Sequence, residues 1–311
     1  MTSRAFRFGV QASPGVDADA WRTVARTVES LGYATLLVAD HVGGNELAPL
    51  PALTTAAEVT TDLRIGTLVI NNDLRHPVTL AREAATLDIL SDGRFELGIG
   101  AGWARGEYEG LGIGFDEPTT RIDRLDEALG VIRQSWSGEL VTARGLHYQV
   151  DGLPGLPRPI QRSGPPILVA GGGDRVVGVA ARHADIVGVH LRMRRDGRGE
   201  DWSTGSAEAT RRRVERIRAA AGDRFAELEL QMMVMTLEIT DRRRGAAERI
   251  ARSEALEVGE VLDSPYRLIG SVDEVVEALE ERRATLGVSY FVVPGGCAAD
   301  FAPVVARLSG R

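Results

Sequence analysis

Short apolar runs alternate with amphipathic segments along the whole chain, and this alternation constrains the fold more than any other feature. The runs have the length of β-strands, and the segments between them repeat apolar residues at helical spacing. Each run is followed by one helical segment, and this pattern is typical of repeated strand–helix units. The strand-like runs are residues 6–12, 35–40, 64–72, 95–103, 166–171, 184–191, 228–239 and 288–293.

Eight such units predict an α/β protein with the (β/α)8 TIM-barrel architecture. A length of 311 residues fits one barrel with insertions, although two small domains would also fit that length. No low-complexity linker divides the chain, so we expect a single domain over residues 1–311 and prefer a closed barrel to a doubly wound sheet. Insertions are expected after strands four, six and seven, and residues 139–165 are expected to contain a short hairpin.

The helical segments carry ordinary start and stop signals. Gly32 ends the first, Pro77 suits the first turn of the third, and Ser271 with Glu274 has the spacing of a capping box. The segment after residue 239 is rich in arginine and glutamate and is expected to be a helical excursion. The expected helices are residues 17–31, 51–61, 77–90, 120–136, 174–183, 206–221, 271–287 and 299–308.

The composition excludes several functional classes. All 37 basic residues are arginine, so lysine Schiff-base and P-loop chemistry are impossible. The net charge of −7 argues against a nucleic-acid partner, and the run Arg211–Arg213 is interpreted as a solvated helix face. A single cysteine, Cys297, forms no internal disulfide and makes a poor metal site. Without an apolar leader or a membrane-length apolar stretch, we expect a cytoplasmic protein with no bound metal and no membrane partner.

The second strand-like run ends in Asp40 and His41, which places an ionisable pair at the expected mouth of the barrel. Histidine titrates near neutral pH, and a carboxylate beside it can orient or charge the ring. The two residues are therefore candidates for proton transfer. A second interpretation, in which they cap the following loop, fits these two residues equally well.

Glycines follow the fourth and fifth runs. Gly98, Gly100 and Gly102 would let a ligand approach the backbone, although glycine also relieves crowding between barrel strands. The run Gly171–Gly173 leads straight into a helix, whose free N–H groups and dipole favour a phosphate; the alternative is a flexible turn capped by Asp174. Weaker candidates near strand ends, which surface solvation also explains, are His190, Arg192 and Glu238.

Taken together and in order, five segments resemble the luciferase-like monooxygenase superfamily. The resemblance runs from Phe8 to about Val293, which is nearly the whole chain. Five ordered matches are far more specific than any one glycine pattern. The segments are VADHV, IGTLVINNDLRHPVTLAREAATLDILSDGR, FELGIGAGWARGEYEGLG, PILVAGGGDRVVGVAARHADIVG and GSVDEVVEALEERRATLGVSYFVV.

The resemblance implies a bacterial luciferase-like barrel with a flavin or deazaflavin across its C-terminal mouth. It also implies a non-proline cis peptide between Leu68 and Val69, in a bulge that supports the ring, and it makes His41 the proton-handling residue. Asp40 would face the ring or the hydroxyl groups of the cofactor's side chain, and the triple glycine would hold its phosphate. The implied cofactor contacts are Asp40, Leu68, Val69, Ala101, Gly102, Trp103, Gly171, Gly172 and Gly173.

Within the superfamily, the residues of these motifs resemble those of the branch that uses coenzyme F420. In that branch the deazaflavin transfers hydride through its C5 carbon. The alternative is an FMN-dependent two-component monooxygenase that uses O2 and receives reduced flavin from a separate reductase. Glucose-6-phosphate dehydrogenases of the F420 branch use lysines and carry a glutamate where this chain has Trp103. That activity is therefore not expected, and a flatter, more apolar substrate such as an unsaturated carbonyl compound is favoured.

Two further hypotheses belong to other classes. One is a non-catalytic cofactor-binding paralogue, for which His41→Ala would change neither affinity nor turnover. The other is a lyase or isomerase barrel that uses only the phosphate site and binds no flavin-like ring. By resemblance we also expect a small-molecule substrate and a homodimer formed by helices near strands two and three.

Overall fold

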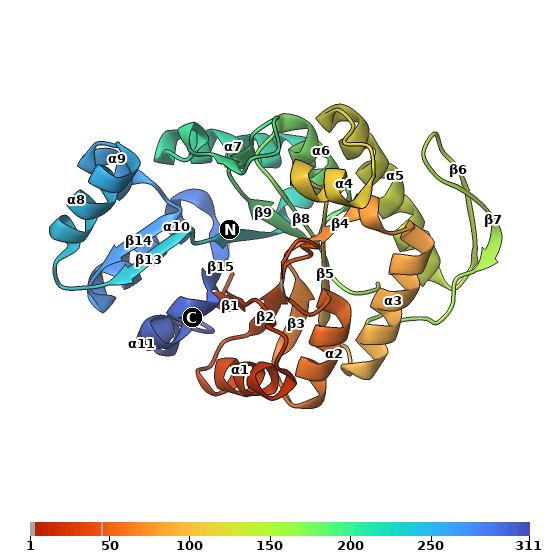
Figure 1. Ribbon diagram of the computed structural model, residues 1–311, viewed down its shortest axis with the longest axis horizontal. Helices are drawn as coiled ribbons and strands as arrows, with labels where there is room; N and C mark the ends of the chain where they lie inside the picture. The colour runs from red at the N-terminus through yellow and green to blue at the C-terminus, as the bar shows by residue number, and fades with distance from the viewer. Residues whose placement is uncertain (1–3, 45) are drawn as a thin grey trace.

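Parallel strands close into a barrel in the order in which they occur along the chain (Figure 1). A computed structural model describes residues 4–44 and 46–311. Within these residues the main sheet is closed by pairing of β3 with β5, and β3 and β4 are two halves of one barrel strand, so the barrel has eight. The predicted (β/α)8 fold is confirmed. The strands are β1 (Arg7–Gln11), β2 (Thr35–Val38), β3 (Arg64–Thr67), β4 (Ile70–Asn71), β5 (Phe95–Gly100), β8 (Ile167–Gly171), β9 (Ile186–Val189), β12 (Glu229–Met233) and β15 (Val288–Pro294).

The third barrel strand is interrupted between Thr67 and Ile70. β3 pairs with the start of β5 through Ile65 and Phe95, and β4 resumes the pairing through Ile70 and Ile99. The peptide bond between Leu68 and Val69, which lies in this gap, is cis, as the sequence resemblance predicted. The strand thus leaves the ladder at the C-terminal end of the barrel, where two side chains that would otherwise lie in the sheet reach the mouth.

The helices surround the barrel and follow the predicted ranges closely. The helix predicted from Asp174 to His183 has those bounds, and the capping box of Ser271 and Glu274 is formed. None of the helices in residues 4–44 and 46–311 is long and apolar enough to cross a bilayer. The helices are α1 (Ala18–Ser30), α2 (Pro49–Glu58), α3 (Pro77–Leu90), α4 (Arg105–Leu111), α5 (Pro118–Ser137), α6 (Asp174–His183), α7 (Ala207–Ala221), α8 (Arg243–Glu254), α9 (Val258–Asp263), α10 (Val272–Leu286) and α11 (Ala298–Leu308).

The seventh strand-like run is not one strand, which corrects the prediction for residues 228–239. Only β12 belongs to the barrel; β13 (Thr236–Ile239) pairs in parallel with β14 (Arg267–Gly270) in a separate two-stranded sheet. Both Met235 and Thr236 donate backbone hydrogen bonds to the carbonyl of Tyr266, so the chain changes sheets at this point. β13, β14, α8 and α9 lie beside the barrel at the left of Figure 1, and the predicted helical excursion consists of α8 and α9.

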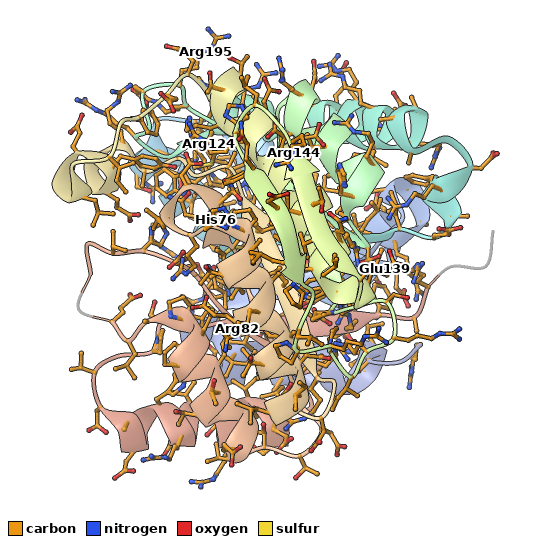
Figure 2. The ribbon with its side chains drawn as sticks, turned by 90° about the vertical axis from the view of Figure 1, so that its right-hand side faces the viewer. His76, Arg82, Arg124, Glu139, Arg144 and Arg195 are labelled. Atoms are coloured by element: carbon orange, nitrogen blue, oxygen red, sulfur yellow. The ribbon has the colours of Figure 1, made fainter. Side chains whose placement is uncertain are left out.

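The predicted hairpin is present on the opposite side of the molecule. β6 (Leu140–Arg144) and β7 (Gln149–Pro154) pair antiparallel. Figure 2 shows the hairpin on the outside of the helical layer, with Arg144 and Glu139 toward its two ends. Its buried side chains, Val141 and Val150, pack with Val131 of α5. The insertion therefore covers outer helices and contributes nothing to the mouth.

Ion pairs fill the N-terminal end of the barrel, a feature that the apolar pattern did not indicate. Glu96 at the start of β5 is 2% exposed, and its Oε1 accepts hydrogen bonds from Arg7 and, at 2.5 Å, from Arg64 Nε. Arg7 also pairs with Glu229 at 2.6 Å and covers the ring of Tyr290. Burial acts to raise the pKa of Glu96, but attraction to the two guanidinium groups outweighs it and the pKa is lowered.

Neutralising Glu96 should destabilise the fold, because removing one partner of a buried ion pair costs about 3–5 kcal/mol. We expect Glu96→Gln to lower the free energy of unfolding in urea at pH 7 by about 3 kcal/mol. Glu208→Gln, which breaks an exposed pair with Arg212 on α7, should change it by less than about 0.5 kcal/mol. Equal losses in the two variants would contradict this account.

The same pair predicts a pH dependence. Because the folded-state pKa of Glu96 is lowered, its stabilising contribution is complete above the unfolded-state pKa of about 4.3 and is lost as the pH falls through the folded-state value. The difference in unfolding free energy between wild type and Glu96→Gln should therefore shrink below about pH 4.

Candidate active site

A cavity of about 500 Å³ opens at the C-terminal end of the barrel, where barrel enzymes place their chemistry. It collects segments from the first seven barrel units, which are far apart in the sequence. Every residue that the sequence resemblance assigned to catalysis or cofactor contact lines this one cavity. They are Asp40, His41, Leu68, Val69, Ala101, Gly102, Trp103, Gly171, Gly172 and Gly173.

His41 makes a short polar contact at the mouth, and its partner is Glu107. The distance from His41 Nδ1 to Glu107 Oε1 is 2.6 Å, and the Trp103 ring packs edge-on against the imidazole with centroids 5.7 Å apart. A carboxylate on Nδ1 fixes the proton there and leaves Nε2 as the nitrogen that can exchange a proton with a ligand. The His41 side chain is 39% exposed, so a small molecule in the cavity can reach it.

Asp40 does not orient His41, which corrects the predicted role of the neighbouring carboxylate. Its Oδ2 accepts hydrogen bonds from Arg75 Nη1 at 2.5 Å and from the backbone N–H of Asn71 at 3.1 Å. The side chain is 2% exposed and compensated by Arg75. Asp40 therefore holds the backbone at the end of β4 and the Arg75 side chain that follows it. This arrangement fits the loop-capping interpretation better than a role in proton transfer.

Sequence reasoning missed Glu107, which lies on the short helix α4. The sequence does contain one sign of this helix, the aromatic residue Tyr108, which anchors it in the structure. The next residue, Tyr108, is fully buried, and its hydroxyl lies 3.1 Å from both Asn71 Oδ1 and Asp73 Oδ2. Burial and the nearby Asp73 raise the pKa of Tyr108 to about 12, so the hydroxyl keeps its proton. An aromatic residue in a short helix after Trp103 was the available sign that this loop is ordered.

The glycines of the fourth strand serve packing as well as access. A Cβ at Gly98 would lie 1.9 Å from the carbonyl oxygen of Thr67, and one at Gly100 would lie 2.9 Å from Val69 Cγ2. Gly102 has φ +72°, and a Cβ there would meet the Tyr108 hydroxyl at 1.9 Å. The alternative interpretation, relief of crowding, is correct for Gly98 and Gly100. Gly100 and Gly102 also line the cavity.

The triple glycine forms the corner of the cavity at the start of α6. Gly173 is the N-cap residue and supplies no side chain, and Asp174 pairs with Arg216 at 2.5 Å instead of capping the helix. The alternative of a turn capped by Asp174 is therefore wrong. Among the described residues no side chain caps this helix, so its first-turn N–H groups and its dipole remain available to an anion.

The weaker candidates divide into two groups. His190 and Arg192 line the cavity, and burial lowers the pKa of His190, which keeps its ring neutral. Glu238 lies on β13 and pairs with Arg249 at 2.5 Å, so its predicted place at the mouth is wrong. In the arginine run, Arg213 is 4% exposed and donates to the Tyr266 hydroxyl at 2.7 Å, which corrects the prediction of a wholly solvated face.

Part of the remaining wall is apolar. Leu68, Val69 and Ile70 line one side, while Met233 and Met235 line another. Arg195 also lines the cavity and lies at the upper edge of the molecule in Figure 2. A site with apolar walls, an anion corner at one end and a histidine–carboxylate pair at another can hold a flat ring carrying a phosphate group and can move a proton beside it.

These features define a barrel protein with a cofactor-sized cavity at its mouth. The family model for luciferase-like monooxygenases matches residues 2–290. The chain belongs to this family, and the prediction made from its five motifs is confirmed.

Curated relatives are similar over part of their length. The chain is 32% identical over 197 residues to an F420-dependent glucose-6-phosphate dehydrogenase of Nakamurella multipartita, which is 60% of this chain and 56% of that protein. It is 33% identical over 168 residues to an F420-dependent hydroxymycolic acid dehydrogenase of Mycobacterium tuberculosis, covering 52% of this chain and 46% of that one. The chain thus matches about half the length of these relatives.

Solved structures share the fold along the whole chain. The monooxygenase RslO1 from Streptomyces bottropensis has a TM-score of 0.75 at 24% identity and covers 97% of this chain and 98% of its own. The coenzyme F420-dependent tetrahydromethanopterin reductase from Methanopyrus kandleri has a TM-score of 0.78 at 18% identity, with 98% of both chains covered. At these identities the likeness establishes the barrel and does not assign the reaction.

The triple glycine offers a matched pair of substitutions. A Cβ at Gly172 would lie 2.4 Å from the backbone nitrogen of Arg192, whereas one at Gly173 would find its nearest neighbour, Val176 Cγ1, at 4.0 Å. We expect Gly172→Ala to lower the free energy of unfolding by about 1–3 kcal/mol, because backbone must move. Gly173→Ala should stay within about 0.5 kcal/mol of wild type. Urea unfolding measures both, and equal effects would argue against the close approach of this corner to the loop at residues 190–192.

Proposed function

We propose that this protein is a coenzyme F420-dependent oxidoreductase that transfers hydride between the deazaflavin C5 and a small organic substrate. The proposal rests on one observation: a single cavity contains an apolar surface for a ring, an uncapped helix N-terminus and the His41–Glu107 pair. The names of the relatives, F420-dependent dehydrogenases, support the choice of cofactor.

The residues at the mouth fit such a cofactor. Leu68 and Val69 offer an apolar surface to one face of a ring, and Gly171–Gly173 with the N–H groups of α6 would hold its phosphate. Gln11 Nε2 donates to the carbonyl of Leu68 at 3.2 Å, which steadies this support from the neighbouring first strand. Arg121 donates to the carbonyls of Ala101 and Gly102 and fixes the opposite wall.

The bound deazaflavin would supply a hydride donor or acceptor at C5. The protein supplies the proton, its placement and the exclusion of water. Glu107 holds the proton on His41 Nδ1, so Nε2 gives or takes the proton that accompanies the hydride at the substrate oxygen. Trp103 packs against the imidazole and limits its rotation.

The substrate is proposed to be flat and largely apolar, such as an unsaturated carbonyl compound. Trp103, Met233 and Met235 line the cavity, and the chain has no lysine for a sugar phosphate. Although Trp103 supplies no carboxylate, Glu107 reaches His41 from α4 and places one beside the imidazole. Carboxylate-assisted alcohol oxidation is therefore chemically possible here.

For assembly we propose a cytoplasmic homodimer of one-domain chains. The helices near the second and third barrel strands were expected to form its interface, and the end of α3 leaves Ile89 and Leu90 exposed, which supports such a contact. A separate reductase as partner belongs to the FMN alternative.

Cofactor titration tests the proposal. Adding F420 to the purified protein should change the visible absorbance of the deazaflavin saturably, and FMN should bind at least about tenfold more weakly, a difference of about 1.4 kcal/mol. Tight binding of FMN without binding of F420 would replace the proposal by the two-component monooxygenase. Binding of neither ring would favour a lyase or isomerase.

A variant pair tests the proton-handling role. Because general acid–base groups contribute typically about 10²–10⁴-fold, we expect His41→Ala to lower kcat by roughly 100-fold or more. Glu107→Gln, which keeps the shape but loses the charge, should lower kcat by roughly tenfold or more and leave KM and F420 affinity within about threefold. Glu109→Gln, on an exposed residue of the same helix, is the control. Unchanged kcat in both test variants would contradict the proton-handling role of this pair, whereas F420 binding without turnover in the wild type would point to a non-catalytic cofactor-binding protein.

A further inference from the structure

A second cavity, of about 240 Å³, lies outside the barrel between α7, α10 and the segment α9–β14. Its walls include apolar side chains of each of these elements, and none of the residues assigned to the mouth takes part. Four arginines line it, Arg211, Arg243, Arg267 and Arg282, and we call it the arginine pocket. This pocket shares no lining residue with the cavity at the barrel mouth. The role proposed for the mouth therefore does not account for these four guanidinium groups.

Of the four arginines, Arg267 is buried and Arg282 is partly buried. The Arg267 side chain is 1% exposed; it gives Nη2 to Glu254 at 2.5 Å and lies over the Trp202 ring. Arg282 gives Nη2 to the carbonyl of Arg267 at 2.8 Å. Within the described part of the chain, Arg267 Nε, Arg267 Nη1 and Arg282 Nη1 are buried and have no hydrogen-bond partner.

Buried guanidinium N–H groups without partners are unusual, because a donor that leaves water without gaining a hydrogen bond is destabilising. Here three such nitrogens belong to two side chains that line one cavity. Burial lowers the pKa of Arg282 to about 10, with Glu281 opposing the shift and Arg243 adding to it. Arg282 thus remains a cation at neutral pH, and its charge is poorly compensated.

The carboxylates near the cavity are already engaged or face solvent. Glu274 Oε2 accepts the Ser271 N–H at 2.8 Å in the capping box, and its Oε1 lies 3.7 Å from Arg243. Asp263 accepts the Ala207 N–H at 3.2 Å. Glu281 is an exposed residue. None of the three forms a hydrogen bond with Arg267 or Arg282 in residues 4–44 or 46–311.

We propose that the arginine pocket binds a small oxyanion of the phosphate type. Guanidinium groups present N–H donors in a planar fork that matches phosphate oxygens. Two such groups line this cavity, and three of their nitrogens have no hydrogen-bond partner among the described residues. A volume of about 240 Å³ is small for a whole metabolite and suits free phosphate or the terminal phosphate of a short molecule. The exposed Arg211 and Arg243 stand at its rim, where they would attract the anion.

Isothermal titration calorimetry with inorganic phosphate tests the proposal, with chloride used to keep the ionic strength constant. We expect one saturable binding event that Arg282→Gln and Arg243→Gln each weaken by about tenfold or more. Arg212→Gln, on the exposed face of α7 and paired with Glu208, removes the same charge outside the pocket and should leave affinity within about twofold. Arg243 lies at the exposed rim, so its variant remains informative if Arg282→Gln fails to fold.

The outcomes separate the possible sources of phosphate binding. Binding that survives both pocket variants unchanged would place the anion elsewhere, for example at the triple glycine, and would overturn the proposal. No saturable binding would overturn it as well. A parallel titration with glycerol phosphate distinguishes the ligands: equal affinity supports a phosphomonoester, and tenfold weaker binding supports free phosphate, on the order of 1.4 kcal/mol.

Discussion

The third barrel strand cannot pass β5 in regular register, and the shape of the mouth depends on this constraint. Gly98 lies so close to Thr67 that a Cβ there would be 1.9 Å from the Thr67 carbonyl oxygen. At this point Thr67 Oγ1 donates to the carbonyl of Gly98 at 2.7 Å and accepts its N–H at 2.9 Å, so a side chain replaces part of the ladder. The chain then departs from the sheet at Leu68 and Val69, and both residues line the cavity.

Buried polar contacts keep this departure in place, and the reactive groups stand outside them. Asp40, Arg75 and the N–H of Asn71 form one set of contacts, and Tyr108 with Asn71 and Asp73 forms the next. These contacts are mostly buried, and together they rigidify the wall. His41 is more exposed and is free to meet a ligand, so the groups that hold the wall differ from the group proposed to move the proton.

The sequence was sufficient for the barrel because its evidence is periodic and local. Strand-like runs, helical spacing and terminal signals such as Ser271 with Glu274 predicted the bounds of most elements to within a few residues. The exception was residues 228–239, where an unbroken apolar run conceals a change of sheet that only the partner strand, β14, decides. Periodicity cannot distinguish one long strand from two that pair with different neighbours.

The site was predictable where motifs follow strand ends and was missed where contacts are long-range. The ten assigned residues do share a cavity. The pairing of His41 with Glu107 was missed because the two residues are 66 apart in the sequence. Adjacency in the chain suggested Asp40 instead, but its carboxylate satisfies Arg75. The prediction of a solvated face for Arg211–Arg213 was wrong for a related reason, because Arg213 makes a long-range contact with Tyr266.

The most direct test of the central claim is a crystal structure of the protein with F420 bound. The account predicts a deazaflavin ring against the Leu68–Val69 segment, its phosphate within hydrogen-bonding distance of the N–H groups that begin α6, and C5 facing the space beside His41. A ring bound outside the barrel mouth, or a phosphate far from the triple glycine, would contradict it.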